Sequence, residues 1–161
     1  MEIRYLAPGD DLLEISSIYE KSWRYAYENI VPQSFLDSIP AGKWADQVAE
    51  NGINSLVVTE NACPVGTASF SRSRWKEYSD YGEIISIYFL PEFIGKGYGK
   101  CLLSKCVEEL KELGFDRILL WVLEENYRAR AFYEKNGFVF SGKCRTDRIG
   151  GRELGELLYV Y

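Results

Sequence analysis

The chain has 161 residues, of which 47% are hydrophobic and 27% charged, and this balance predicts one globular domain spanning residues 1–161. Its net charge of −5 argues against nucleic-acid binding, which needs a basic face. It has no histidine, which excludes an imidazole base, a Ser-His-Asp triad and a histidine-bound metal, so we expect no metal cofactor.

The N-terminal half predicts a short strand, several helices and a pair of strands. Ile3–Leu6 is expected to be a strand, and Pro8-Gly9-Asp10 supplies a turn, with Asp10 as the N-cap of a helix. That helix is indicated by apolar residues at helical spacing, namely Leu12, Ile15, Ile18, Tyr19, Trp23, Ala26 and Tyr27. The further expected elements are a short helix between Pro32 and Pro40, a helix over Lys43–Glu50, strands over Leu56–Thr59 and Val65–Ser71 joined by a turn at Asn61, and a loop over Arg72–Tyr81.

The C-terminal half alternates strands and helices before two closing strands. Glu83–Leu90 is expected to be a strand, and the helix that follows it carries one apolar stripe and ends at Gly114. The apolar run Ile118–Leu123 is typical of a strand covered on both faces. The remaining elements are a helix from Asn126 to Gly137 and strands over Phe138–Arg145 and Leu154–Tyr161. This order predicts a mixed α/β sheet with a right-handed crossover between the Glu83 and Ile118 strands.

Cysteine usage and hydropathy bear on the compartment. The four cysteines form no CxxC pair, and we expect them to be reduced structural thiols. The N-terminus lacks a signal-peptide pattern, and no apolar run is long enough to span a bilayer. We therefore expect a soluble, cytoplasmic protein that binds neither membranes nor nucleic acids.

Three glycines at alternate positions, Gly95, Gly97 and Gly99, lie where the Glu83–Leu90 strand passes into a helix. Glycine lets the backbone turn tightly and approach a ligand, and the first turn of a helix offers unpaired N–H groups with partial positive charge. The junction therefore predicts a phosphate or pyrophosphate site. It is not a Walker loop, because Gly99-Lys100 is not followed by Ser or Thr. A dinucleotide fingerprint is disfavoured by the G-x-G-x-G spacing, and a purely structural turn remains an alternative.

Two segments resemble those of the GCN5-related N-acetyltransferase (GNAT) family. Leu90–Lys100 is similar to its acyl-coenzyme A motif, with Gly97 and Gly99 at the two small positions and Ile94 where Arg or Gln is usual. Asn126–Phe138 resembles the second family block. The resemblance implies the acyl-CoA N-acyltransferase fold, a mixed, mostly antiparallel sheet flanked by helices. It also implies an enzyme that moves the acetyl group of acetyl-CoA to a primary amine by direct attack in a ternary complex.

The same resemblance assigns the coenzyme contacts to the glycine loop and to the strand before it. Backbone N–H groups of the loop would hold the pyrophosphate, and the strand end would pair with the pantetheine arm, which Asn126 also meets. The coenzyme-binding residues so implied are Tyr88, Phe89, Leu90, Gly95, Lys96, Gly97, Tyr98, Gly99, Lys100 and Asn126. For Asn126 a plain helix N-cap is an alternative that is compatible with this role.

The implied catalytic residues are an acid and a base. Tyr133 matches the tyrosine that protonates the coenzyme A thiolate in many members, and a packed aromatic beside Phe132 is its alternative reading. Glu83 resembles a position that supplies a base in several members, often through water. Its alternative is an ordinary strand-end carboxylate. Glu124 and Glu125 are further candidates for the base.

The acceptor side is expected to be walled by the first helices and by the loop before the Glu83 strand. The candidate acceptor residues are Trp23, Tyr27, Trp75 and Glu124, although such aromatics often serve the core. The acceptor is expected to be a small-molecule amine, with a protein N-terminus as the alternative. A non-catalytic acyl-CoA sensor is the competing function. Dimerisation is common in the resembling family, so a homodimer stays open, but nothing in the sequence specifies an interface.

Overall fold

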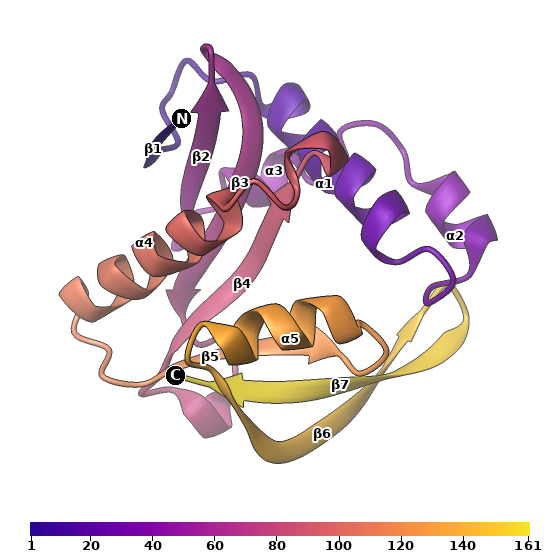
Figure 1. Ribbon diagram of the computed structural model, residues 1–161, viewed down its shortest axis with the longest axis vertical. Coiled ribbons are helices and arrows are strands. Elements are labelled where there is room, and N and C mark those ends of the chain that lie inside the picture. Colours follow the sequence, from indigo (N-terminus) through magenta and orange to yellow (C-terminus); the bar gives the residue numbers. More distant parts are fainter.

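A computed structural model describes residues 1–161, and its seven strands form one sheet with helices on both faces (Figure 1). The strands are β1 (Glu2–Tyr5), β2 (Asn54–Glu60), β3 (Cys63–Arg72), β4 (Gly82–Phe89), β5 (Ile118–Leu123), β6 (Val139–Ile149) and β7 (Arg152–Val160). The α-helices are α1 (Leu12–Ala26), α2 (Gln33–Ser38), α3 (Ala45–Val48), α4 (Tyr98–Glu112) and α5 (Tyr127–Lys135). The strand order is β1-β2-β3-β4-β5-β7-β6, and only the β4–β5 pair is parallel. The predicted mixed, mostly antiparallel sheet is therefore confirmed.

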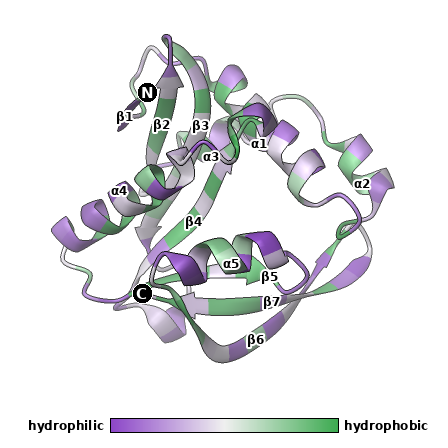
Figure 2. Ribbon diagram, viewed as in Figure 1, coloured by the Kyte–Doolittle hydropathy of each residue, from purple (hydrophilic) through white to green (hydrophobic).

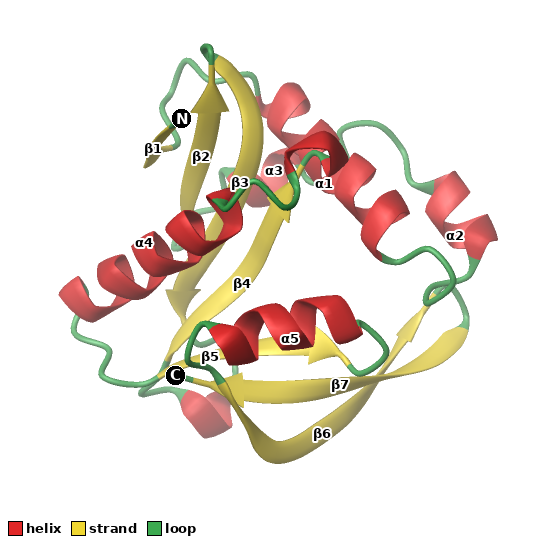
Figure 3. Ribbon diagram, viewed as in Figure 1, coloured by secondary structure: helices red, strands yellow, loops and turns green.

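Two hydrophobic clusters lie on opposite faces of this sheet. One contains the buried side of α4, and the other contains residues of α1, α2 and α3; we call these sides the α4 face and the α1 face. Leu56 and Val58 of β2 belong to the α4 face and Val57 to the α1 face, because neighbouring strand residues point in opposite directions. Figure 3 shows α4 and α5 on the near side of the sheet. In Figure 2 the hydrophobic residues are concentrated in the central strands.

The start of α1 differs from the prediction by one residue. Asp11, not Asp10, is the N-cap, and its carboxylate accepts the N–H of Leu13 at 2.9 Å. Asp10 instead forms a bidentate ion pair with Arg4, which lowers the pKa of the Asp10 carboxyl to about 2. The prediction was wrong because the sequence offers two adjacent aspartates, and only the fold shows which of them Arg4 takes.

The other predicted elements are present, with small changes of extent. The helix predicted over Lys43–Glu50 is one turn, Ala45–Val48. The predicted loop Arg72–Tyr81 contains a 3-10 turn at Lys76–Tyr78, and a second 3-10 turn, Pro91–Phe93, follows β4.

The parallel pair β4–β5 is very short. Only two residue pairs join the strands, Gly82 with Ile118 and Glu83 with Leu119. Beyond them β4 stays paired with β3 as far as Phe89, while β5 stays paired with β7. The two strands therefore diverge, as Figure 1 shows, and the outer part of β4 has a paired edge toward β3 and an unpaired edge toward β5.

We predict that Gly66→Ala destabilises the fold. Gly66 lies opposite Phe89 in the β3–β4 ladder, and a Cβ at this position would overlap the buried Phe89 ring. Overpacking of this kind costs about 1–3 kcal/mol, so the free energy of unfolding should fall by that amount in urea titrations. Gly9→Ala is the control, because a Cβ there meets no atom within 4 Å. Equal stability of the two variants would contradict the prediction.

Candidate active site

The loop between β4 and α4 presents a run of unpaired backbone donors. Gly95 and Gly97 adopt φ of +87° and +86°, in the left-handed region, and Gly97 is the N-cap of the 15-residue helix α4. None of the five N–H groups from Gly95 to Gly99 donates to an acceptor within the protein. Successive amides in such a turn, at the positive end of a helix dipole, form an anion-binding concavity. The arrangement suits a phosphate or pyrophosphate group.

Two side chains of this loop are engaged within the protein, and its two lysines are exposed. Ile94, where the resembling motif has Arg or Gln, packs against the core of the α4 face. The Tyr98 hydroxyl donates to Glu60, and the Lys96 ammonium lies 4.2 Å from the centroid of the Phe93 ring. Lys100 is exposed. An anion held here would meet the backbone N–H groups and the positive charge of the two exposed lysines.

The end of β4 offers a second set of backbone groups. Phe89 is buried, and its carbonyl accepts the Ser22 hydroxyl. Leu90 donates its N–H to Val65 at 2.9 Å. Tyr88 pairs with Thr67 on the β3 side, and because backbone groups alternate along a strand, those of Ile87 and Phe89 face the divergence of β4 and β5. An extended ligand could form β-type hydrogen bonds along this edge.

Three tyrosines with shifted pKa values come from β4, from α5 and from the residue that follows α1. The hydroxyls of Tyr27 and Tyr88 are 3.2 Å apart, and burial raises the pKa of Tyr27 to about 12. Tyr133 is half-buried in α5, with its ring against Phe132 and Phe138, and its hydroxyl makes no hydrogen bond within the protein. Burial is the main cause that raises the pKa of the Tyr133 phenol, and the Tyr88 phenol adds to the effect. The structure thus joins Tyr27 and Tyr88 on the α1 face, whereas Tyr133 packs against the core of the α4 face.

Asn126 occupies the position predicted for it at the start of α5. Its Oδ1 accepts the N–H of Ala129 at 3.1 Å, which is the geometry of a helix N-cap. Its side-chain nitrogen, Nδ2, makes no hydrogen bond within the protein and remains available to a ligand.

Glu83 is buried, with an exposed fraction of 1%, and both of its oxygens are occupied. Oε2 accepts the backbone N–H and the Nε of Arg74, and Oε1 accepts Nη2 of Arg74 at 2.8 Å and the indole N–H of Trp75 at 3.3 Å. The carboxylate therefore ties the loop before β4 to the strand. Because no oxygen is left free for an amine, this geometry favours an anchoring role over the predicted role as base.

The predicted acceptor residues do not form one group. Trp23 packs among Tyr27, Trp44 and Phe35 on the α1 face, whereas Trp75 lies beside Trp121 of β5 with ring centroids 5.7 Å apart.

Glu124 also lies apart from Trp75. Its side chain covers Gly155, and strand alternation places it on the opposite side of the sheet from Glu156. Glu125 forms an exposed ion pair with Arg152.

Sequence reasoning missed three residues that form one connected group with Trp75, namely Trp121, Arg145 and Glu156. The Arg145 guanidinium lies 4.0 Å from the centroid of the Trp75 ring and 4.6 Å from that of Trp121, and it forms an ion pair with Glu156. Trp121 lies in the apolar run of β5, where the sequence does not distinguish it from a core residue. The opposite charges of Arg145 and Glu156 were the available signal, but using it requires the register of β6 and β7.

Comparison with known proteins identifies the family. The model of the acetyltransferase (GNAT) family matches residues 12–138. The chain belongs to the GNAT acetyltransferase family. As a GNAT protein it is an N-acetyltransferase that uses acetyl-CoA.

Named relatives and solved structures agree with this assignment. The spermidine N(1)-acetyltransferase of Thermoplasma acidophilum is 26% identical over 156 residues, 92% of this chain and 94% of that protein. Two crystal structures share the fold. The PaiA N-acetyltransferase of Thermoplasma acidophilum in complex with coenzyme A has a TM-score of 0.75 at 21% identity, covering 99% of this chain and 96% of that one. A ribosomal-protein-alanine N-acetyltransferase from Brucella melitensis has a TM-score of 0.76 at 22% identity, covering 100% and 99%.

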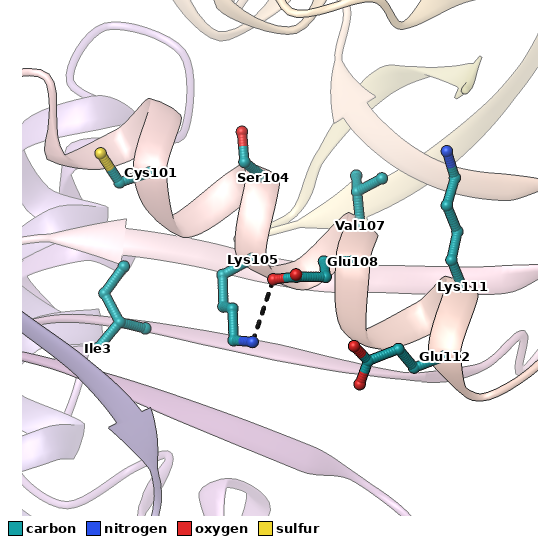
Figure 4. Close-up of a pocket in the computed structure, with 8 residues that line it drawn as sticks. All are labelled: Ile3, Cys101, Ser104, Lys105, Val107, Glu108, Lys111 and Glu112. Atoms are coloured by element: carbon teal, nitrogen blue, oxygen red, sulfur yellow. Dashed lines mark hydrogen bonds and ion pairs between the residues drawn. The ribbon is translucent and has the colours of Figure 1, made fainter.

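Other features of this GNAT chain lie away from the glycine loop. A shallow cavity of about 780 Å³ runs along the outer side of α4, and Figure 4 shows its lining side chains, including Ile3, Cys101 and an ion pair between Lys105 and Glu108. It contains none of the predicted site residues.

No group of three or more acidic or cysteine side chains is arranged to hold a metal ion. None of the helices combines the length and hydropathy that crossing a bilayer requires.

We predict that Glu83→Gln loosens the loop before β4. Removing the charge that the Arg74 and Trp75 donors share should lower the free energy of unfolding by about 1–3 kcal/mol. Trypsin should also cut faster after Arg74, and both effects can be followed by urea titration and timed digestion. The control is Asp80→Asn in the same loop, which breaks an exposed pair with Arg117 and should change stability by less than about 0.5 kcal/mol. A Glu83 variant no less stable than this control would disprove the anchoring role.

Proposed function

We propose that this acetyltransferase acetylates a primary amine of a small molecule by direct attack on acetyl-CoA in a ternary complex. The observation that carries the proposal is the run of five unpaired N–H groups beside the open edge of β4, with the Tyr133 hydroxyl nearby. A relative named for spermidine supports a small amine. A structural neighbour named for ribosomal-protein alanine keeps a protein N-terminus as the second candidate.

Acetyl-CoA is a substrate here, and the chain offers groups that fit each part of it. The amides of Gly95–Gly99 would hold the pyrophosphate, with the helix dipole of α4 adding positive potential. The open edge at Tyr88–Leu90 would pair with the amides of the pantetheine arm, and the free amide nitrogen of Asn126 would donate to it. A backbone N–H of this edge would also polarise the thioester carbonyl. The neighbour solved with coenzyme A supports this assignment.

Tyr133 would protonate the thiolate that leaves when the amide forms. Its raised pKa does not prevent this, because burial acts on thiols in the same direction. The buried Cys106 thiol, which contributes to the Tyr133 environment, has its pKa raised to about 12 by burial. A coenzyme thiolate released in this dry region is likewise a stronger base than in water, so a phenol remains a suitable proton donor.

Substitution of the second loop glycine tests the coenzyme site. Gly97→Val should weaken acetyl-CoA binding at least about tenfold, equivalent to about 1.4 kcal/mol, because its side chain strains the turn and blocks the approach to the N–H groups. Gly114→Val is a matched control at the other end of α4, with φ of +92° and no atom within 4 Å of its Cβ. It should lose stability but bind acetyl-CoA normally in calorimetric titration. Normal affinity in a folded Gly97 variant would remove the loop assignment.

Loss of the phenol tests the chemistry. The wild-type protein is first assayed with acetyl-CoA and a panel of spermidine, amino sugars, amino acids and an alanine-initiated peptide. With the best acceptor, Tyr133→Phe should lower kcat by about a hundredfold or more, with acetyl-CoA affinity unchanged. Tyr127→Phe, a change at an exposed tyrosine of the same helix, should leave kcat unchanged.

Unchanged turnover in the Tyr133 variant would remove the acid role. Coenzyme binding without transfer to any amine would indicate a sensor instead.

A further inference from the structure

One carboxylate on the α1 face has a free oxygen. Glu156 of β7 lies opposite Leu123 of β5 and two residues from Leu154, and both leucines belong to the cluster of the α1 face. Strand alternation therefore places the Glu156 side chain on that face, where the aromatic rings of Tyr27 and Tyr88 also lie. Its side chain has an exposed fraction of 13%, so it is largely shielded but still reached by solvent.

The contacts of Glu156 are one-sided. Nε of Arg145 donates to Oε2, and Nη2 of Arg145 forms an ion pair with the same oxygen. Oε1 accepts no hydrogen bond within the protein. The buried carboxylate of Glu83 differs because four donors occupy both of its oxygens.

The ion pair is held in place by aromatic rings. Arg145 stacks on both Trp75 and Trp121, at 4.0 and 4.6 Å from the ring centroids. Trp75 is itself held by its indole N–H, which donates to Glu83. A connected series of contacts thus runs from buried Glu83 through Trp75 and Arg145 to Glu156. It fixes one carboxylate oxygen of Glu156 and leaves the other free.

We propose that Oε1 of Glu156 receives the ammonium group of the acceptor and takes its proton, so that the neutral amine attacks the thioester. This role rests on the proposed function and names the base that the function requires. The ammonium gives one proton to Glu156, and the nitrogen lone pair forms the C–N bond as the C–S bond breaks. The nitrogen loses a second proton as the amide forms. That proton replaces the one Tyr133 gives to the thiolate, and the proton on Glu156 leaves to water.

The charged and titratable groups around Glu156 come from three elements. Arg145 and Asp147 belong to β6, Arg74 to the loop before β4, and Tyr27 follows α1. Burial, the largest cause, raises the pKa of the Glu156 carboxyl; Asp147 raises it further, and the two arginines lower it. A carboxylate whose pKa is raised toward that of the amine is a more effective base. The Glu156 charge in turn raises the pKa of Tyr27, whose hydroxyl bonds to that of Tyr88.

The test is the pH dependence of kcat/KM with the amine found in the acceptor panel. For wild type the rate should fall at low pH as Glu156 protonates and reach a plateau below the pKa of the amine. Glu156→Gln should lose the plateau, with kcat/KM rising with pH toward the pKa of the amine, and kcat should fall by about a hundredfold or more. Acetyl-CoA affinity should stay within about twofold, because no coenzyme contact is assigned to Glu156. The matched control is Glu153→Gln, an exposed glutamate of the same strand, which should keep the wild-type profile.

A second variant keeps Glu156 in place. Asp147→Asn removes a negative charge that raises the Glu156 pKa, so the low-pH fall should move to lower pH with the plateau unchanged. An unmoved fall, or a folded Glu156→Gln protein that keeps the wild-type profile, would disprove the role of Glu156 while the acetyltransferase function stands. A wild-type protein that binds no acetyl-CoA and acetylates no amine would overturn the proposed function and this role with it.

Discussion

The separation of β4 from β5 after two residue pairs is the constraint on which the rest of the site depends. A continuous parallel pair would use the backbone groups of both strands, and none would remain for a ligand. Because the strands part, the outer edge of β4 stays unpaired in the middle of the sheet, and the loop of Gly95–Gly99 begins α4 just beyond it. The N–H groups of this edge and of this exposed loop have no partner within the protein and are open to water or to a ligand.

Glu83 and Glu156, two shielded carboxylates on the same face, differ in how many donors surround them. Glu83, at the last β4–β5 pair, is saturated by donors and makes the following loop part of the rigid sheet. Glu156 lies beyond the separation and keeps one oxygen free. Each has an arginine partner, so both charges are compensated where they are buried. The rigid series of contacts that joins them means that a change at Glu83 should reach Glu156 through Trp75, although the two carboxylates make no direct contact.

The features that could be predicted are those whose signal lies within one short segment of the sequence. The glycine loop, the stripe of α4, the Asn126 cap and the apolar β5 each show in a few consecutive residues, and together they led to the correct fold class and family. The parts that were missed depend on pairing between distant segments. Whether Asp10 or Asp11 caps α1 depends on Arg4, and the neighbours of Glu156 depend on the register of three strands. The partners of Glu83 lie in the loop Arg72–Tyr81, whose composition does not predict a defined conformation. That loop is held by its hydrogen bonds to the buried Glu83 carboxylate.

The unpaired edge of β4 differs from the outer edges of the sheet in how it is shielded. An exposed strand edge is a template on which another chain can add a strand, and proteins usually shorten such edges or place charges along them. The outermost strands here follow that pattern, since β1 has four residues and β6 carries Lys143, Arg145, Asp147 and Arg148. The open edge of β4 has neither protection. It lies instead between two halves of one sheet, with α4 and α5 packed on one face. A strand added by another chain would have to enter between β4 and β5, so the place of this edge within the sheet shields it where its sequence does not.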